Sequence, residues 1–313
     1  MNVYILSDLE GAACVFSRRE GYGNAAEYGS MELAAVCREL LDGGASRILV
    51  NCLHPMEYHK FPDCVEFVHG EPVDDLLTSC LDETFDMAMV TGMHAMAGGP
   101  DKGCWRHTLL PPPISRAYSG IAQISVNGMP IGEAGLFALF AGISGVPVTY
   151  LSGDYWACEE IRRILPDIET CAVKRGTSFY SARSLHPAEA ARRSAAAAAR
   201  ALKLAGTVKP YCVDGKLEVL CRYTFANRAA DAMRLVERAR RVDEYTVAVT
   251  YDSALEFRNH LGCFRAPEDE LHREDLGLSS VSGFLARTGV EPYEDACGFS
   301  YPRQEDFALS NWK

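Results

Sequence analysis

The sequence predicts an α/β fold: a mostly parallel sheet flanked by helices, with a smaller α+β second domain or lobe. Two observations lead to this prediction. Apolar, strand-like segments alternate with helical segments in the first half of the chain, and such alternation is typical of parallel sheets. A second, shorter strand-helix-strand-helix series begins after Gly206. We therefore expect an α/β metal-binding domain over 1–205, a smaller α+β domain over 206–264 and a C-terminal extension over 265–313.

The first part of the larger domain has three strand signals and one helix signal. The short apolar run 2–7 is typical of a buried strand. Residues 31–41 have apolar side chains at helical spacing and stop before a Gly-Gly pair, which favours the end of a helix. The apolar runs 47–51 and 87–91 predict the next two strands.

The second part of the larger domain begins with a hairpin signal. Two-residue alternation over 122–126 is followed by Asn127 and Gly128, a pair that favours a tight turn. A helix, a strand and another helix are then expected over 133–141, 146–151 and 155–165. The alanine-rich run 187–204 predicts a surface helix, because alanine has the highest helix propensity.

The smaller domain repeats the alternation over a shorter span. Its expected elements are strand 217–225, helix 229–240, strand 245–251 and helix 254–260. Weak periodicity with scattered Gly and Pro follows. We expect this extension to wrap the body of the protein or to join an interface.

The composition excludes several classes of protein. The chain of 313 residues has a formal net charge of -11, whereas binding to nucleic acid needs clustered Lys and Arg. No apolar run is long enough to cross a bilayer, and the N-terminus lacks the basic start of a signal peptide. The 12 cysteines include no C-x-x-C pair. We therefore expect reduced thiols in the cytoplasm, with no membrane or nucleic-acid partner.

Acidic and histidine side chains follow three of the predicted strands. Asp8 and Glu10 come directly after the first strand, His54 after the second and His94 after the third. Ligands of open α/β sheets bind beyond the carboxyl ends of the strands, so we expect these side chains to meet at one edge. On an extended backbone, Asp8 and Glu10 lie on the same face. Glu133, at the start of a later helix, completes the candidate set.

Two imidazoles and three carboxylates favour a metal site. This mixed nitrogen and oxygen set suits Zn2+, and also Mn2+, Co2+ or Fe2+. It holds more donors than one tetrahedral zinc requires, and two metals that share a carboxylate are the natural expansion. Each residue also has an ordinary alternative: a helix cap or a surface acid for the carboxylates, and a packed loop residue for the histidines.

His107 lies on a glycine-rich loop that follows His94. A histidine on a loop near a metal can act as an acid-base group or can anchor a substrate. Its alternative is an exposed loop histidine without a chemical role.

An ordered set of motifs resembles a known family, the DppA-type zinc D-aminopeptidases. The segment 7–11, Ser-Asp-Leu-Glu-Gly, is similar to the opening signature of that family. The similarity continues through the motifs at 50–54, 92–95, 130–136, 148–154, 172–174, 185–187 and 225–227. It covers residues 1–262, most of the chain.

The resemblance implies a cytoplasmic metalloprotease, an aminopeptidase that hydrolyses short peptides with an N-terminal D-amino acid, such as D-Ala-D-Ala. It implies a catalytic role for His107 and a homo-oligomer, a decameric ring whose sites face an internal channel. It also implies a dinuclear zinc centre bound by Asp8, Glu10, His54, His94 and Glu133.

Three features depart from the family pattern. Cys52 stands where the second motif usually has aspartate, the loop between His94 and His107 is longer, and the chain beyond Cys263 has no counterpart. A thiolate ligand from Cys14, Cys52 or Cys104 is one alternative, and ordinary packing of these residues is the other. Alternative functions on the same scaffold are hydrolysis of another amide or of a phosphoester, and a ring-forming binding protein without turnover.

Overall fold

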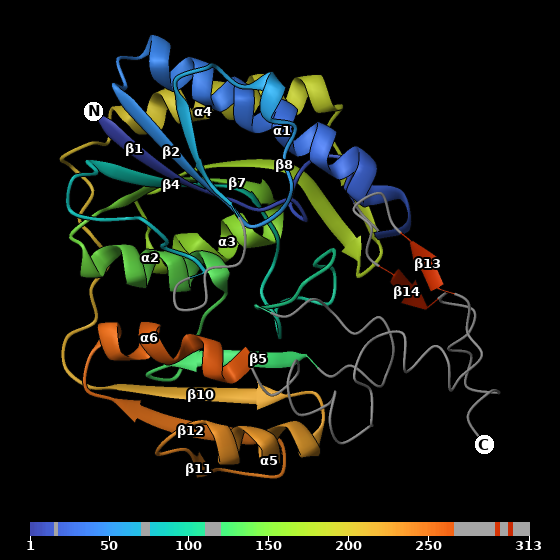
Figure 1. Ribbon diagram of the computed structural model, residues 1–313, viewed down its shortest axis with the longest axis vertical. Coiled ribbons are helices and arrows are strands. Elements are labelled where there is room, and N and C mark those ends of the chain that lie inside the picture. The colour runs from blue at the N-terminus through green and yellow to red at the C-terminus, as the bar shows by residue number, and fades with distance from the viewer. Residues whose placement is uncertain (16–17, 70–75, 110–119, 266–291, 295–299, 303–313) are drawn as a thin grey trace.

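The computed structural model describes residues 1–15, 18–69, 76–109, 120–265, 292–294 and 300–302. Within these ranges, a seven-stranded sheet carries helices on both faces and a five-stranded sheet lies beside it (Figure 1). The larger sheet is mostly parallel and the smaller is antiparallel. The predicted α/β class is confirmed.

The larger sheet has the strand order β3-β2-β1-β4-β7-β8-β9. All neighbouring strands run parallel except β8 and β9, which form an antiparallel pair. Because β1 and β4 lie at the centre with β2 and β7 beside them, their carboxyl ends meet at the middle of one edge. The strands are β1 (Asn2–Ser7), β2 (Arg47–Cys52), β3 (Val65–Val68), β4 (Met87–Met93), β7 (Val148–Asp154), β8 (Glu169–Ser178) and β9 (Ser181–Ser184).

Alternating side chains of β1 enter two different cores. Val3 and Ile5 belong to the core shared with α1 and α4, whereas Tyr4 and Leu6 belong to the core shared with α2 and α3. Figure 1 shows these helix pairs on opposite faces of the sheet. Burial on both faces explains why β1 and β4 have near-continuous apolar sequences. The helices are α1 (Arg18–Asp42), α2 (Glu133–Ile143), α3 (Tyr155–Ile164) and α4 (Pro187–Leu202).

The smaller sheet has the order β11-β12-β10-β5-β6. Its two central contacts join β10 to β5 and to β12. Helix α6 packs against α2, where the rings of Phe140 and Phe257 meet edge to face with centroids 5.5 Å apart. The elements are β5 (Ile121–Val126), β6 (Met129–Pro130), β10 (Leu217–Tyr223), α5 (Ala226–Leu235), β11 (Arg240–Arg241), β12 (Thr246–Tyr251) and α6 (Ala254–Arg265).

The hairpin predicted at Asn127 and Gly128 is confirmed. Both residues have positive φ, 50° and 79°, as a type I′ turn requires. The turn joins β5 to β6, and the chain then enters α2 directly. Glu133 is thereby the first residue of that helix.

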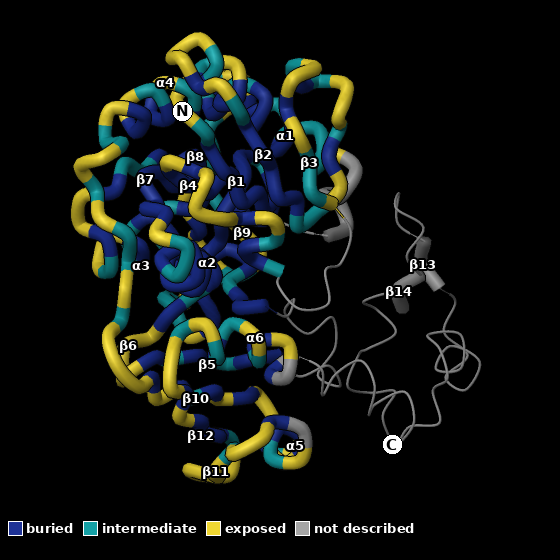
Figure 2. The backbone as a smooth tube through the Cα atoms, turned by 60° about the vertical axis from the view of Figure 1, so that its left-hand side comes forward, coloured by how far each residue is buried: buried dark blue, intermediate teal, exposed yellow. Residues whose placement is uncertain are grey.

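Several expected boundaries differ from the structure. The helix predicted over 31–41 begins earlier, at Arg18. The prediction missed the first turns because they lack regular apolar spacing. The helix predicted over 229–240 ends at Leu235, and Arg238 turns the chain with a φ of 63°. Strands β3, β8 and β9 and the short 3-10 helix Tyr58–Lys60 had no sequence signal. Many side chains of β8 and β9 are exposed or only partly buried, so these strands lack an apolar run (Figure 2).

The smaller sheet takes strands from two separate parts of the chain. β5 and β6 come from within 1–205, while β10, β11 and β12 come from within 206–264. How the chain divides into domains stays a prediction. Most of the extension 265–313 lies outside the described residues. In its described part, β13 (Pro292–Glu294) pairs with β14 (Ser300–Pro302). No helix among the described residues has the length and apolarity that a membrane span requires.

Candidate metal centre

Asp8 and Glu10 lie in a tight segment directly after β1. The Asp8 N–H donates to the Thr91 carbonyl at 2.9 Å, and the Gly11 N–H donates to the Gly92 carbonyl at 2.6 Å. The segment after β1 is therefore tied to the end of β4 on both sides of the two acids. Both carboxylates are buried.

Two glycines allow this close approach. A Cβ at Gly11 would lie 1.9 Å from the Met93 carbonyl oxygen, and a Cβ at Gly92 would lie 2.0 Å from the Asp8 carbonyl oxygen. Gly92 also has a φ of +68°, which glycine adopts readily. Backbone thus packs directly on backbone beside Asp8 and His94.

His54 follows β2, and its imidazole reaches across to the acids of β1. Its Nε2 lies 3.2 Å from Asp8 Oδ1 and 3.0 Å from Glu10 Oε2. The Leu53 N–H donates to the Ser7 carbonyl at 3.0 Å, which continues the β1–β2 pairing to this point. The side chain is 23% exposed, so this side of the centre is open to solvent.

His94 follows β4 and is buried. Its Nδ1 lies 2.9 Å from the Ala95 carbonyl oxygen. A carbonyl oxygen only accepts, so Nδ1 carries a proton and Nε2 is the nitrogen that could bind a metal. That Nε2 lies 3.3 Å from Asp8 Oδ2 and 3.4 Å from Glu133 Oε1.

His107 is brought beside His94 by the loop between them. The backbone N–H of His107 donates to the Ala95 carbonyl at 3.1 Å, and the backbone N–H of Ala97 donates to the His107 carbonyl at 3.0 Å. The two imidazoles stack with centroids 3.8 Å apart and an angle of 13°. The His107 Nδ1 donates to the Trp105 carbonyl at 2.7 Å, so its Nε2 also keeps a lone pair.

Glu133 comes from the N-terminus of α2, where a carboxylate is favoured by the helix dipole. The Leu109 N–H donates to its Oε1 at 2.7 Å. Helix start and loop together hold this acid against His94.

The six side chains form two groups of potential metal donors. Asp8, Glu10 and His54 make one group, and His94, His107 and Glu133 make the other. In each group the donor atoms lie within 4.8 Å of one another. Asp8 joins the groups, because one of its oxygens faces His54 and the other faces His94.

The donor spacing fits bound zinc. In a tetrahedral site with bonds of about 2.0–2.2 Å, neighbouring donors lie about 3.3–3.6 Å apart. The nitrogen-to-oxygen distances here are 3.0 to 3.4 Å. In the described part of the chain, the buried Asp8 Oδ2 and His94 Nε2 have no hydrogen-bond partner. A cation between them would satisfy both atoms.

The charges of the cluster also call for a cation. Burial raises the pKa of Asp8 to about 7, with the nearby Glu10 adding to the effect. Burial opposes ionisation of Glu10 as well, but His54 outweighs it and holds the pKa of Glu10 well below its ordinary value. Burial disfavours charge on His94, yet Glu133 and Asp8 raise its pKa to about 10. Without a metal, protons on His54 and His94 balance the carboxylates.

The cysteines near the site are packed rather than aimed at it. Cys52 is buried in the core beneath α1, and burial raises the pKa of its thiol to about 12. Cys104 is buried too, and burial raises the pKa of its thiol. None of Cys14, Cys52 and Cys104 belongs to a donor group among the described residues.

Two buried charged residues outside the predicted set of metal ligands support the segment after β1. The Lys174 ammonium, from β8, donates to the carbonyls of Glu10 and Val15. Glu32, from α1, accepts from the Ala13 N–H at 2.8 Å. Charged residues in a sequence usually indicate exposed positions. The burial of these two residues is therefore evident only from the fold.

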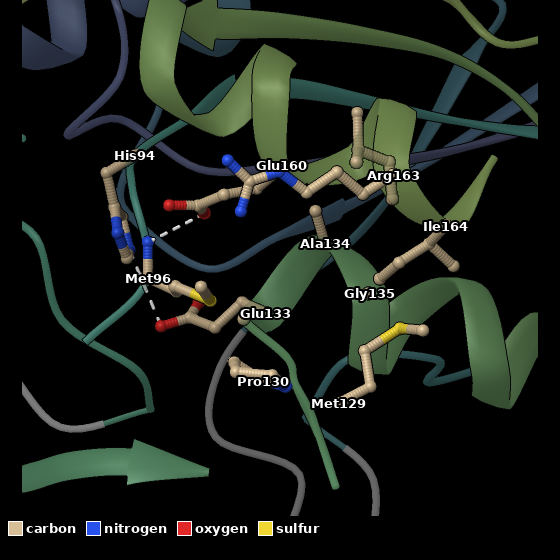
Figure 3. Close-up of a pocket in the computed structure, with 12 residues that line it drawn as sticks. His94, Met96, Met129, Pro130, Glu133, Ala134, Gly135, Glu160, Arg163 and Ile164 are labelled. Atoms are coloured by element: carbon tan, nitrogen blue, oxygen red, sulfur yellow. Dashed lines mark hydrogen bonds and ion pairs between the residues drawn. The ribbon is translucent and has the colours of Figure 1, made fainter. Parts of the chain in front are cut away.

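A cavity of about 160 Å³ lies against the second donor group (Figure 3). His94 and Glu133 form part of its wall, and residues of α3, including Glu160 and Arg163, form another part. The metal centre therefore has adjoining space for a small molecule.

Comparisons with known proteins agree on one group of enzymes. The sequence model of the Peptidase_M55 family, described as D-aminopeptidase, matches residues 1–263. A D-aminopeptidase of Bacillus subtilis (strain 168) is 29% identical over 220 residues, which are 67% of this chain and 77% of that protein. A solved structure, that of the Zn-dependent D-aminopeptidase DppA from Bacillus subtilis, a self-compartmentalizing protease, matches with a TM-score of 0.78 and 24% identity. That match covers 86% of this chain and 98% of the other.

Proposed function

This chain belongs to the Peptidase_M55 family of D-aminopeptidases, and from that membership we propose that it is a zinc aminopeptidase for short peptides that begin with a D-amino acid. D-Ala-D-Ala-like dipeptides are the expected substrates. The observation that carries the proposal is the convergence of two donor groups on the shared carboxylate of Asp8.

Each donor group would hold one ion, which gives two per subunit. Glu10 and His54 would hold the first ion, His94 and Glu133 would hold the second, and Asp8, whose oxygens face both groups, would contribute to both. Zinc is favoured because a protein of the same fold is described as Zn-dependent, although Mn2+, Co2+ and Fe2+ accept the same donors. When bound, zinc supplies a Lewis acid that activates water and polarises the scissile carbonyl.

His107 is the proposed proton carrier. Burial, together with the charge of His94, lowers its pKa to about 4, so its imidazole is neutral near pH 7. Its Nε2 can take a proton from the attacking water as the C–O bond forms. It can then deliver that proton to the leaving nitrogen as the C–N bond breaks. Water is consumed, and an amino acid and a shortened peptide are released.

The family supports a proposal for the assembly, and the cysteine pattern one for the location. A protein of this fold is described as self-compartmentalizing, which supports a homo-oligomer. We propose a closed ring, decameric as the sequence resemblance implies, with the sites facing its interior. The proposed compartment is the cytoplasm.

The proposal is tested with purified protein loaded with zinc. D-Ala-D-Ala, L-Ala-L-Ala and a phosphoester are offered to the wild type, to a chelator-treated sample and to the same sample after zinc is restored. We expect turnover of the D-dipeptide, its loss with the chelator and its return with zinc. Metal content is measured by mass spectrometry, with two zinc ions expected per subunit.

Three results would contradict the proposal. Protein that binds no divalent metal would remove the proposed centre. Zinc-loaded protein that cleaves the phosphoester but no D-aminoacyl peptide would favour the alternative of another metallohydrolase. A metal-loaded ring with no turnover of any substrate would favour a binding protein.

A further inference from the structure

The cavity beside the metal centre contains an acidic side chain that belongs to neither donor group. Glu160, on α3, lines this cavity together with His94 and Glu133. In Figure 3 the carboxylates of Glu133 and Glu160 both point toward the imidazole of His94. An acid therefore stands beside the position where a substrate would meet the metals.

One oxygen of Glu160 is engaged and the other is not. Its Oε2 accepts from the Met96 N–H at 2.9 Å. Its Oε1 is buried and has no hydrogen-bond partner within the described ranges of the chain. The neighbouring Glu159 differs, because it is paired with Arg162 at 2.7 Å on the surface. Glu160 thus keeps an acceptor that a ligand could use.

The rest of the cavity suits a small residue. Its wall includes the side chains of Met96, Met129 and Ile164. Its volume of about 160 Å³ is close to that of an engineered cavity that admits benzene. One short amino-acid side chain with its ammonium group would fill such a space.

An enzyme that removes N-terminal residues has to recognise a free ammonium group. Asp8, Glu10 and Glu133 are engaged with the proposed metals, which leaves Glu160 as the carboxylate of this wall without such a task. We propose that Glu160 is a specificity-determining residue that binds the α-ammonium group of the substrate's N-terminal residue through Oε1. This inference rests on the proposed function, since it assumes an aminopeptidase.

The charge balance of the cavity agrees with this role. Burial raises the pKa of Glu160 to about 7, and the Met96 N–H, His94 and Arg163 offset that effect only in part. A buried carboxylate with an unused acceptor gains from a cationic partner. An ammonium group would supply both the charge and the missing hydrogen bond.

The test variant is Glu160→Gln. Glutamine keeps the shape and an acceptor for the Met96 N–H, so the segment after His94 stays in place, while the negative charge is lost. Glu159→Gln is the matched control, because it removes the adjacent carboxylate that lies outside the cavity.

Binding is measured by calorimetry on the zinc-loaded proteins with two probes that cannot be hydrolysed. They are D-(1-aminoethyl)phosphonate and ethylphosphonate, which differ by the amino group. We expect the aminated probe to bind about 10- to 100-fold more tightly to the wild type and to Glu159→Gln, as for a charge-assisted hydrogen bond. The preference should fall to within about 3-fold in Glu160→Gln, and its KM for D-Ala-D-Ala should rise with little change in kcat.

The outcomes separate this inference from the proposed function. A Glu160→Gln protein that keeps both its zinc and the full preference for the aminated probe overturns amine recognition, whatever its turnover. A variant that loses zinc but keeps the preference also overturns it and assigns Glu160 to the support of His94. A wild type that shows the preference but cleaves no D-peptide overturns the proposed function and leaves amine recognition supported.

Discussion

The two donor groups reach the same chemistry by different routes. Asp8, Glu10 and His54 follow the ends of two parallel strands, whereas the second group combines a strand end, a loop and a helix start. The His54 side chain is 23% exposed and the His94 side chain 1%. The first group is thus open to solvent only at His54 and depends on the sheet, while the second is enclosed and depends on loop hydrogen bonds.

Different neighbours support the two groups. Behind the first group lie the buried charges of Lys174 and Glu32, which hold the segment after β1. Behind the second group lie backbone partners, the Trp105 carbonyl and the Leu109 N–H. The comparison teaches that the donors after β1 are held through contacts to the chain segment that carries them, whereas the donors on the loop and at the helix start are each held by a backbone hydrogen bond.

Replacement of His94 should have the largest effect, because its imidazole contacts both groups. We expect His94→Ala to lower kcat/KM for D-Ala-D-Ala by more than about 10,000-fold, since ligand loss removes metal activation of water. Metal content should fall for both groups. His59→Ala, at an exposed histidine, is the control. Retained turnover in His94→Ala would remove this residue from the centre.

A variant of His107 tests whether this residue of the second group is a metal ligand or a proton carrier. His107→Gln should lower kcat by about 100- to 1000-fold, in the range of a lost general acid-base group. Its zinc content should stay at the wild-type value. If the variant instead loses one zinc ion, His107 is a ligand and the proton carrier must be sought elsewhere.

A variant of His54 tests whether metal binding by the first donor group can be weakened alone. His54→Ala should lower activity by about 100-fold and reduce the zinc content from two ions to one, because His94 and Glu133 remain. Metal analysis and steady-state kinetics measure both effects. Loss of both ions would show that the groups bind metal as a single unit.

The smallest effect is expected at Glu32, which supports the first group from α1. Burial raises its pKa to about 7 from an ordinary 4.5. Between these values the native state holds a proton that the unfolded state releases, so its contribution to stability falls as the pH rises. From pH 5 to pH 8, the free energy of unfolding of Glu32→Gln should therefore rise by about 1–3 kcal/mol relative to that of the wild type.

Urea unfolding of both proteins at each pH measures this difference. Glu83→Gln, at an exposed acid, is the control and should show no such gain. A difference between wild type and Glu32→Gln that is the same at both pH values would contradict the prediction.

The sequence predicted that the side chains at the strand ends would meet at one edge of the sheet. Asp8, His54 and His94 each follow an apolar run, and parallel strands bring such positions to one edge. The structure does bring them together. For His107 the loop left two alternatives open and only the family resemblance implied a catalytic role, because its place depends on loop hydrogen bonds that no periodic pattern reveals.

Glu160 was missed for a different reason. It stands beside Glu159 on a helix with arginines, and such a pattern is typical of a solvated surface. Helical spacing carries the signal that Glu160 points inward. Glu160 is three residues after the buried Ala157, whereas Glu159 faces solvent with Arg162. Strands β8 and β9 were missed because their many exposed positions leave no apolar run.

The contact between Gly11 and Gly92 has a consequence for how substrate preference can change. Because backbone touches backbone there, the separation of Asp8 from His94 is set by the main chain and leaves no room for a larger residue. New preferences, whether by natural drift or by engineering, have to arise in the walls of the adjoining cavity. Saturation libraries at Met96, Met129 and Ile164 should yield altered specificities, while libraries at the two glycines should yield inactive protein.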